Sequence, residues 1–238
     1  QRDLALKVMM ERHLAMKPHV WQASLEGPRP QYRRKARLAI DARNPNQIKL
    51  GFREANSNNV INVETCPILV DPLSTIIGPL RDALTGFESA RHIGHVSLVA
   101  GDNTSHLVIK HTKALEAELI DAVSALVSEN SSVSDHDIEL KLENKQGQIR
   151  SVGKHTDIVM NTVNGCSISP SANDFIQINK VVNEKMINQA IDWLSPQPDE
   201  RVADWFSGLG NFTLPIAKRG AKVQAIEGVA EMVRRAKD

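Results

Sequence analysis

Two glycines and one carboxylate near the end of the sequence have the types and spacing that hold a nucleotide-like cofactor. The segment DWFSGLGNFTLP, residues 204–215, places Gly208 and Gly210 between a short apolar run and a run that can begin a helix. Glycines after a buried strand let the backbone approach a ligand, and the next helix then points its N-terminus at that ligand. Glu227 lies nineteen positions after Gly208, at the end of the next strand-like run. A carboxylate there can accept hydrogen bonds from both ribose hydroxyls.

The residue after these glycines discriminates between ligands. The dinucleotide fingerprint has a third small residue where the helix packs beside a pyrophosphate, and this chain has Thr213 at that position. Thr213 therefore counts against NAD and FAD, and an adenosine without a pyrophosphate fits better. We expect S-adenosylmethionine. A nicotinamide-dependent Rossmann oxidoreductase, and a turn that merely connects strand to helix, are the less favoured alternatives.

The composition is that of an ordinary globular protein. The chain has 238 residues, of which 41% are hydrophobic and 24% charged, and its 29 Lys and Arg nearly balance its 28 Asp and Glu. The total charge therefore does not favour nucleic acid, and only a local patch could. The two cysteines, Cys66 and Cys166, form no disulfide framework and fit a reducing cytosol. The apolar runs are too short to span a bilayer. We expect a cytoplasmic protein without a membrane partner.

The periodicity of apolar residues predicts the elements around the turn. A helix over 180–194, a strand over 201–206, the glycine turn and a strand over 221–228 are the opening of a doubly wound α/β domain. Upstream, hairpin-paired strands alternate with helices, which suggests an antiparallel α+β domain. Its predicted elements are a β-hairpin over 35–53, strands over 95–100, 106–110 and 138–143, and helices over 71–84 and 115–126. Gly78 and Pro79 predict a kink in the first of these helices.

Several motifs, taken together, resemble one family. They are DWFSGLGNFTLP with AIEGV, SPSANDFIQIN, YRRKARL, LGFREANSNNVINVETCPIL and RHIGHV. The chain looks like the RNA uracil-5-methyltransferases, and most like the bacterial branch that acts on 23S ribosomal RNA. The likeness runs over nearly the whole chain, and the combination is specific although each motif alone is weak.

The resemblance implies a domain organisation. Residues 1–24 would contain a helix that packs on the catalytic domain. Residues 25–172 would form a central α+β domain that binds RNA and an iron–sulfur cluster. Residues 173–238 would form the first part of a Rossmann-like α/β S-adenosylmethionine-dependent methyltransferase domain.

The resemblance also implies a mechanism. A cysteine thiolate adds to C6 of a flipped-out uracil, C5 takes the methyl group of S-adenosylmethionine, and a base then removes the C5 proton. The other three cluster cysteines are expected before Gln1, and the nucleophile and base after Asp238. We therefore expect no catalytic residue in this span and an inactive fragment. An RNA-binding module without catalysis is the alternative, and the oligomeric state stays open.

Individual positions match the functional positions of the family. In the cofactor site, Gln177 matches a contact to the methionine part, Phe206 and Asn211 match contacts beside Gly208 and Gly210, and Glu227 matches the ribose carboxylate. Ser207 stands where the family usually has Cys, a change of small expected consequence.

The remaining matches concern RNA and the cluster. Phe175 matches a residue near the target base, and Arg33 matches an RNA-contacting arginine. Cys66 matches the fourth ligand of a 4Fe–4S cluster, whereas composition alone would make it a buried, inert thiol.

One basic run allows two interpretations. Five cations with one tyrosine among them lie at Arg29, Tyr32, Arg33, Arg34, Lys35 and Arg37. They could form a solvated strand face, or a phosphate-binding edge on which the aromatic ring stacks a base. His92 and His95 lie three positions apart without an acidic or Cys partner at ligand spacing, so we expect no metal site there.

Overall fold

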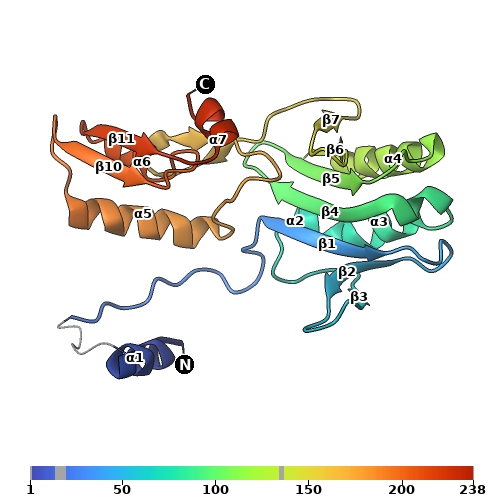
Figure 1. Ribbon diagram of the computed structural model, residues 1–238, viewed down its shortest axis with the longest axis horizontal. Coiled ribbons are helices and arrows are strands. Elements are labelled where there is room, and N and C mark those ends of the chain that lie inside the picture. Colours follow the sequence, from blue (N-terminus) through green and yellow to red (C-terminus); the bar gives the residue numbers. More distant parts are fainter. Residues whose placement is uncertain (1, 14–19, 134–136, 238) are drawn as a thin grey trace.

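A seven-stranded sheet carries most of the core. The computed structural model describes residues 2–13, 20–133 and 137–237. The strand order in this central sheet is β3-β2-β1-β4-β5-β6-β7 (Figure 1). The strands are β1 Lys35–Asp41, β2 Lys49–Arg53, β3 Val60–Asn62, β4 Ile93–Ala100, β5 Ser105–His111, β6 Ile138–Glu143 and β7 Ile149–Ser151. The predicted hairpin is confirmed, because β1 and β2 pair antiparallel with Ala39 opposite Gly51.

Helices pack apolar side chains against this sheet. They are α2 Asp71–Thr75, α3 Ile77–Leu84 and α4 Ala117–Val133, with a short 3-10 helix, η1 Glu88–His92, before β4. Leu38 and Leu98 from the sheet share one buried cluster with Leu73, Leu80 and Leu119 from the helices. The predicted amphipathic helices therefore form the main core.

The break in the helix predicted over 71–84 falls earlier than expected. The α2 helix ends at Thr75 and α3 begins at Ile77, so the chain breaks at Ile76 and not at Gly78 or Pro79. Pro79 lacks the backbone N–H that would donate to the carbonyl of Thr75, four residues earlier. The proline therefore interrupts the helix one turn before its own position.

One pair of strands contradicts the antiparallel expectation. Strands β5 and β6 are parallel, with Ser105 opposite Ile138, and α4 provides the crossover between them. The alternation of IELKLE correctly predicted a strand, but all six residues of β6 are buried. Its polar residues meet partners instead of solvent: Glu143 pairs with Lys110 at 2.5 Å, and Glu139 accepts a hydrogen bond from the Thr156 N–H at 2.9 Å.

A loop layer covers part of the opposite face of the sheet. It contains β8 Met160–Asn161, η2 Val163–Gly165 and β9 Ser167–Ile168. Val99 and Val108 of the sheet pack there with Ile158, Met160 and Ile176. This segment leads directly from the central sheet into the second unit.

The second unit begins with α5 Lys180–Leu194, which Asn179 caps by accepting a hydrogen bond from the Val182 N–H at 3.1 Å. It continues with β10 Arg201–Trp205, α6 Thr213–Ala217, β11 Lys222–Ile226 and α7 Ala230–Arg235. Strands β10 and β11 are parallel, and Ile187, Ile191 and Ile216 form a separate buried cluster. The predicted helix–strand–turn–helix–strand order is confirmed, and this unit lies beside the central sheet in Figure 1.

The first helix, α1 Arg2–His13, lies away from the sheets in Figure 1. Leu4 and Met9 are exposed by more than half, and Asp3 accepts a hydrogen bond from the Ser24 hydroxyl. Its expected packing on a catalytic domain therefore stays a prediction. Within the described ranges, no helix is both long and apolar enough to cross a membrane.

Candidate cofactor-binding site

The glycine turn joins the end of β10 to the start of α6 through three left-handed residues. The φ angles are 63° at Phe206, 58° at Gly208 and 94° at Gly210. Glycine adopts this conformation without steric cost, whereas Phe206 pays for it in strain. Such strain in a non-glycine residue is typical of functional sites, and the Phe206 side chain is 89% exposed beside the turn.

Glu227 closes the turn from the end of β11. Its Oε2 accepts a hydrogen bond from the Gly208 N–H at 2.9 Å, and its Oε1 accepts one from the Val229 N–H at 2.8 Å. These backbone donors, Val229 first, lower the pKa of Glu227. An ionised carboxylate has about four acceptor positions, so acceptor capacity remains for a hydroxyl group of a ligand. The structure thus brings Gly208 and Glu227 together as the spacing predicts.

Side-chain hydrogen bonds fix the far side of the turn. Asn211 and Asn183, on α5, exchange amide hydrogen bonds at 3.0 and 2.9 Å. The Thr213 hydroxyl donates to Asp204 on β10. Thr213 therefore ties the start of α6 to the strand, at the position where a dinucleotide fold has its third small residue. Ser207, the departure from the family pattern, is buried in the turn.

Phe175 and Gln177 lie on the segment that enters α5. Both residues are exposed, whereas Asp174 before them and Ile176 between them are buried. The side chains of Phe175 and Gln177 therefore share one side of an extended segment, as expected. Arg235 of α7 holds the Asp174 carboxylate at 2.6 Å. This ion pair fastens the segment to the second unit.

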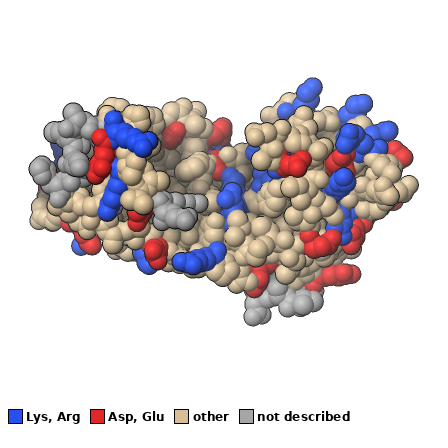
Figure 2. All heavy atoms as spheres, turned by 90° about the horizontal axis from the view of Figure 1, so that it is seen from below, with Lys and Arg blue, Asp and Glu red and all other residues tan. Residues whose placement is uncertain are grey.

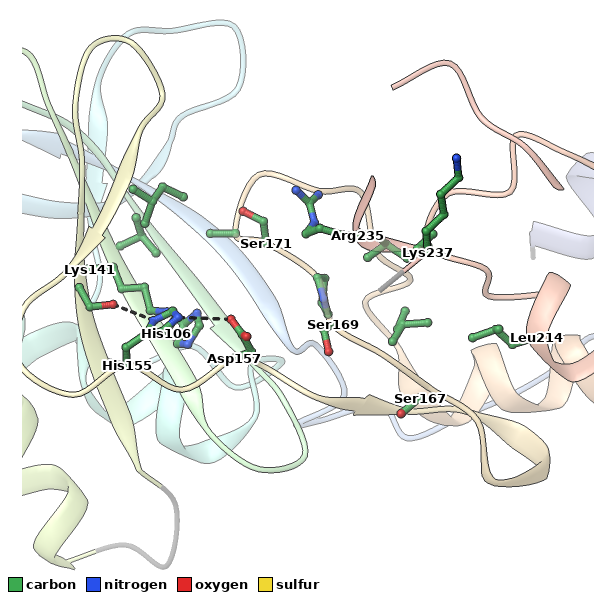
Figure 3. Close-up of a pocket in the computed structure, with 18 residues that line it drawn as sticks. His106, Lys141, His155, Asp157, Ser167, Ser169, Ser171, Leu214, Arg235 and Lys237 are labelled. Atoms are coloured by element: carbon green, nitrogen blue, oxygen red, sulfur yellow. Dashed lines mark hydrogen bonds and ion pairs between the residues drawn. The ribbon is translucent and has the colours of Figure 1, made fainter. Parts of the chain in front are cut away.

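A cleft of about 770 Å³ lies between the central sheet and the second unit. Figure 3 shows His106, Lys141 and His155 on one side of it and Arg235 and Lys237 on the other. Burial and nearby Lys141 lower the pKa of His106 to about 4, so its ring is neutral at physiological pH. The sequence carries no signal for this cleft, because its polar residues lie in strands and loops without a recognisable motif.

The expected cluster ligand is a buried thiol. Cys66 is 8% exposed, and Ser74 on α2 fixes its backbone, accepting from the Cys66 N–H and donating to the Cys66 carbonyl, both at 3.0 Å. Cys166 is also buried and free. Over the described part of the chain, no group of three or more His, Cys, Asp or Glu side chains is placed to hold a metal ion. These residues do not fit a complete iron–sulfur cluster by themselves.

The residues of the basic run differ in exposure, and only some of them fit a solvated strand face. Arg37 is exposed on β1, as a solvated face requires. Lys35 donates instead to the Asp174 carbonyl, and Arg33 Nε donates to the Lys35 carbonyl at 2.9 Å. Arg34 is buried. On the face shown in Figure 2, basic side chains are mixed with acidic ones, so no single-sign surface singles out a partner.

Comparisons with known proteins agree on one family. The family model of tRNA (uracil-5-)-methyltransferases matches residues 1–237. The chain is 71% identical over 237 residues to a 23S rRNA (uracil(1939)-C(5))-methyltransferase of Alteromonas mediterranea, covering 100% of this chain and 48% of that protein. A protein of the same name from Alteromonas naphthalenivorans is 51% identical over 236 residues, which cover 99% of this chain and 49% of that protein. The chain thus spans about half the length of the curated relatives it matches.

A solved structure shares the fold. The tRNA (uracil-54, C5)-methyltransferase of Pyrococcus abyssi, in complex with S-adenosyl-L-homocysteine, superposes with a TM-score of 0.67 at 17% identity, covering 99% of this chain and 58% of that one. The match of the family model over residues 1–237 shows that the chain belongs to the tRNA (uracil-5-)-methyltransferase family.

Proposed function

We propose that this chain forms part of an enzyme that methylates C5 of a uridine in 23S ribosomal RNA, the one equivalent to position 1939 in the names of the relatives. The observation that carries the proposal is the Glu227 carboxylate, held against the glycine turn by Gly208 and Val229 with acceptor positions to spare. An RNA substrate of this kind assigns the protein to the cytoplasm.

The cofactor is S-adenosylmethionine, which supplies the methyl group when it is bound. Glu227 accepts hydrogen bonds from its ribose hydroxyls, and Gly208 and Gly210 allow close approach of the backbone. Gln177 contacts the methionine part, and Phe206 and Asn211 contact the cofactor beside the glycines. The exposure of Phe206 and Gln177 and the fixed position of Asn211 support these assignments.

The RNA is contacted from the other side of the site. Phe175, 79% exposed, faces the target base, and Arg33 contacts the RNA backbone. Cys66 would supply one thiolate to a 4Fe–4S cluster whose other ligands this chain does not provide.

Deleting the gene that encodes this chain tests the proposal. Mass spectrometry of 23S rRNA fragments should show the loss of one methyl group at the equivalent uridine, and the wild-type gene should restore it. A Glu227→Gln gene should restore it poorly, whereas Glu231→Gln, an exposed carboxylate paired with Arg234, should restore it fully.

Three results would contradict the proposal. Methylation that persists in the deletion strain would remove the assigned substrate. RNA binding by the wild-type protein without methyl transfer would favour the non-catalytic RNA-binding module. Calorimetric binding of NADH but not of S-adenosylmethionine would favour the oxidoreductase.

A further inference from the structure

A second cavity, of about 360 Å³, lies between the start of the central sheet and the start of α5. Its polar lining residues are Gln31, Tyr32, Arg34, Asp102, Asn179 and Lys180. None of them belongs to the cofactor site described above. The cavity is large enough for a small ligand.

Arg34 brings two nitrogens without a hydrogen-bond partner to the lining of this cavity. The residue is 6% exposed, and its Nε and Nη1 atoms have no hydrogen-bond partner among the described residues. A buried guanidinium without a partner is costly and is normally paired. Burial lowers the pKa of Arg34, while the charges of Asp102 and Glu184 raise it. These two nitrogens therefore have no hydrogen-bond acceptor among the described residues, although Asp102 and Glu184 lie within electrostatic reach.

The neighbouring acid, Asp102, already holds two other donors. Asp102 pairs with Lys180 Nζ at 2.8 Å through one oxygen and accepts a hydrogen bond from the Asn161 N–H at 2.6 Å through the other. Lys180 has three donors, so it can bind a second acceptor. Two cations, Arg34 and Lys180, and one carboxylate, Asp102, line the cavity, and Glu184 outside the lining also acts on Arg34.

The start of α5 supplies a second feature that favours an anion. Asn179 and Lys180 line the cavity at the N-terminus of a fifteen-residue helix. The first N–H groups of a helix lack intrahelical acceptors, and the helix dipole favours a negative ligand there. The helix end and the buried guanidinium are independent features that favour the same ligand charge.

We propose that this cavity binds a backbone phosphate of the RNA substrate, held by Arg34 and Lys180. A phosphate accepts the forked N–H groups of a guanidinium, and the Tyr32 ring and the cavity's Pro28 and Pro72 offer apolar contact to the attached nucleoside. The choice of RNA rests on the proposed function. The proposal assigns the phosphate-binding role within the basic run to Arg34. The family resemblance had pointed to the preceding residue, Arg33.

Fluorescence anisotropy with a labelled RNA oligonucleotide carrying the target uridine tests this site in the full-length protein. Arg34→Met and Lys180→Met should each raise Kd about tenfold. Each should also lower the slope of log Kd against log salt concentration by about one. Arg43→Met removes an exposed arginine paired with Asp41 outside the cavity and should leave both quantities near wild type. Affinity for S-adenosylmethionine should be unchanged in all three variants.

Lys180→Met keeps the test decisive if the buried Arg34 variant does not fold, because the Lys180 side chain is 39% exposed. Wild-type Kd and slope in the variants would overturn the site while leaving the proposed function intact. Failure of the wild-type protein to bind RNA would instead overturn the proposed function.

The source of the phosphate is tested separately, by melting the protein in inorganic phosphate. A stabilisation that Arg34→Met abolishes, with RNA affinity equal in both proteins, would assign the cavity to a free phosphate ligand and overturn the RNA assignment. A structure of the protein in which one of its own carboxylates accepts hydrogen bonds from the Arg34 guanidinium would overturn both the RNA phosphate and the free phosphate assignments.

Discussion

The carboxylate of Glu227 accepts a hydrogen bond from the backbone N–H of Gly208 at 2.9 Å, across nineteen residues. The contact joins the ends of the two parallel strands β10 and β11, the edge where open α/β sheets bind ligands. The group expected to hold a ribose therefore also holds the turn in shape. Changes at Glu227 should affect both the binding of a ligand and the local structure.

Replacing Glu227 by Gln should raise Kd for S-adenosylmethionine about tenfold or more, because hydrogen bonds to a charged acceptor are stronger than those to an amide. Calorimetric titration at pH 7.5 measures the change. The pKa of Glu227 is lowered in the folded protein, so its contribution is present above the ordinary pKa of a glutamate and is lost as the pH falls through the lowered value. Wild-type affinity should therefore be insensitive to Glu227 titration between about pH 8 and 5. Equal affinities for wild type and variant would contradict the ribose assignment.

Gly210→Ala should destabilise the protein more than Gly147→Ala. Both glycines have positive φ, 94° and 83°, so an alanine at either position costs about 1–2 kcal/mol. A Cβ at Gly210 would also lie 3.1 Å from Leu214 Cγ, whereas a Cβ at Gly147 would meet nothing within 4 Å. Urea denaturation of the two variants isolates the steric contribution of the turn. Equal losses would show that Leu214 moves aside without cost.

The pattern of residues predicted much of this architecture. The 35–53 hairpin, α4 and α5 follow from local periodicity, and the glycine turn and Glu227 follow from spacing, because a strand–turn–helix–strand unit fixes the distance between strand ends. These elements need only nearby residues to be recognised. The proximity of the glycine turn and Glu227 was therefore predictable from sequence, whereas their direct hydrogen bond was not.

Other features depend on tertiary contacts and were not predictable. The left-handed conformation of Phe206 has no signal in its residue type, which disfavours it. The burial of β6 on both faces depends on partners such as Lys110 and Thr156, and the parallel pairing of β5 with β6 depends on where α4 packs. The two Arg34 nitrogens that lack a hydrogen-bond partner among the described residues become apparent only in the folded chain.

Asn183 and Asn211 should be energetically coupled. Asn183 is 4% exposed and exchanges two amide hydrogen bonds with Asn211. Asn183→Leu leaves the partner amide unsatisfied and should cost about 1–3 kcal/mol of unfolding free energy, and Asn211→Leu a similar amount. The double variant should cost less than the sum of the two. Urea denaturation of all four proteins measures the coupling, and strict additivity would show that the pair does not hold the turn to α5.

His106 should make the protein less stable as the solution becomes acidic. Its pKa is lowered to about 4, first by burial and then by Lys141, against the opposing effects of the Thr156 carbonyl and Glu139. A lowered folded-state pKa means that the stabilisation is complete above the unfolded value of about 6.5 and is lost as the pH falls from there through about 4. The loss attributable to His106 should reach up to about 3 kcal/mol. His106→Gln should flatten the curve of unfolding free energy against pH between about 6.5 and 4, whereas His13→Gln, on exposed α1, should leave it unchanged. Denaturant titrations across this range test the prediction, and parallel curves for wild type and His106→Gln would show that protonation of the buried ring is compensated within the cleft.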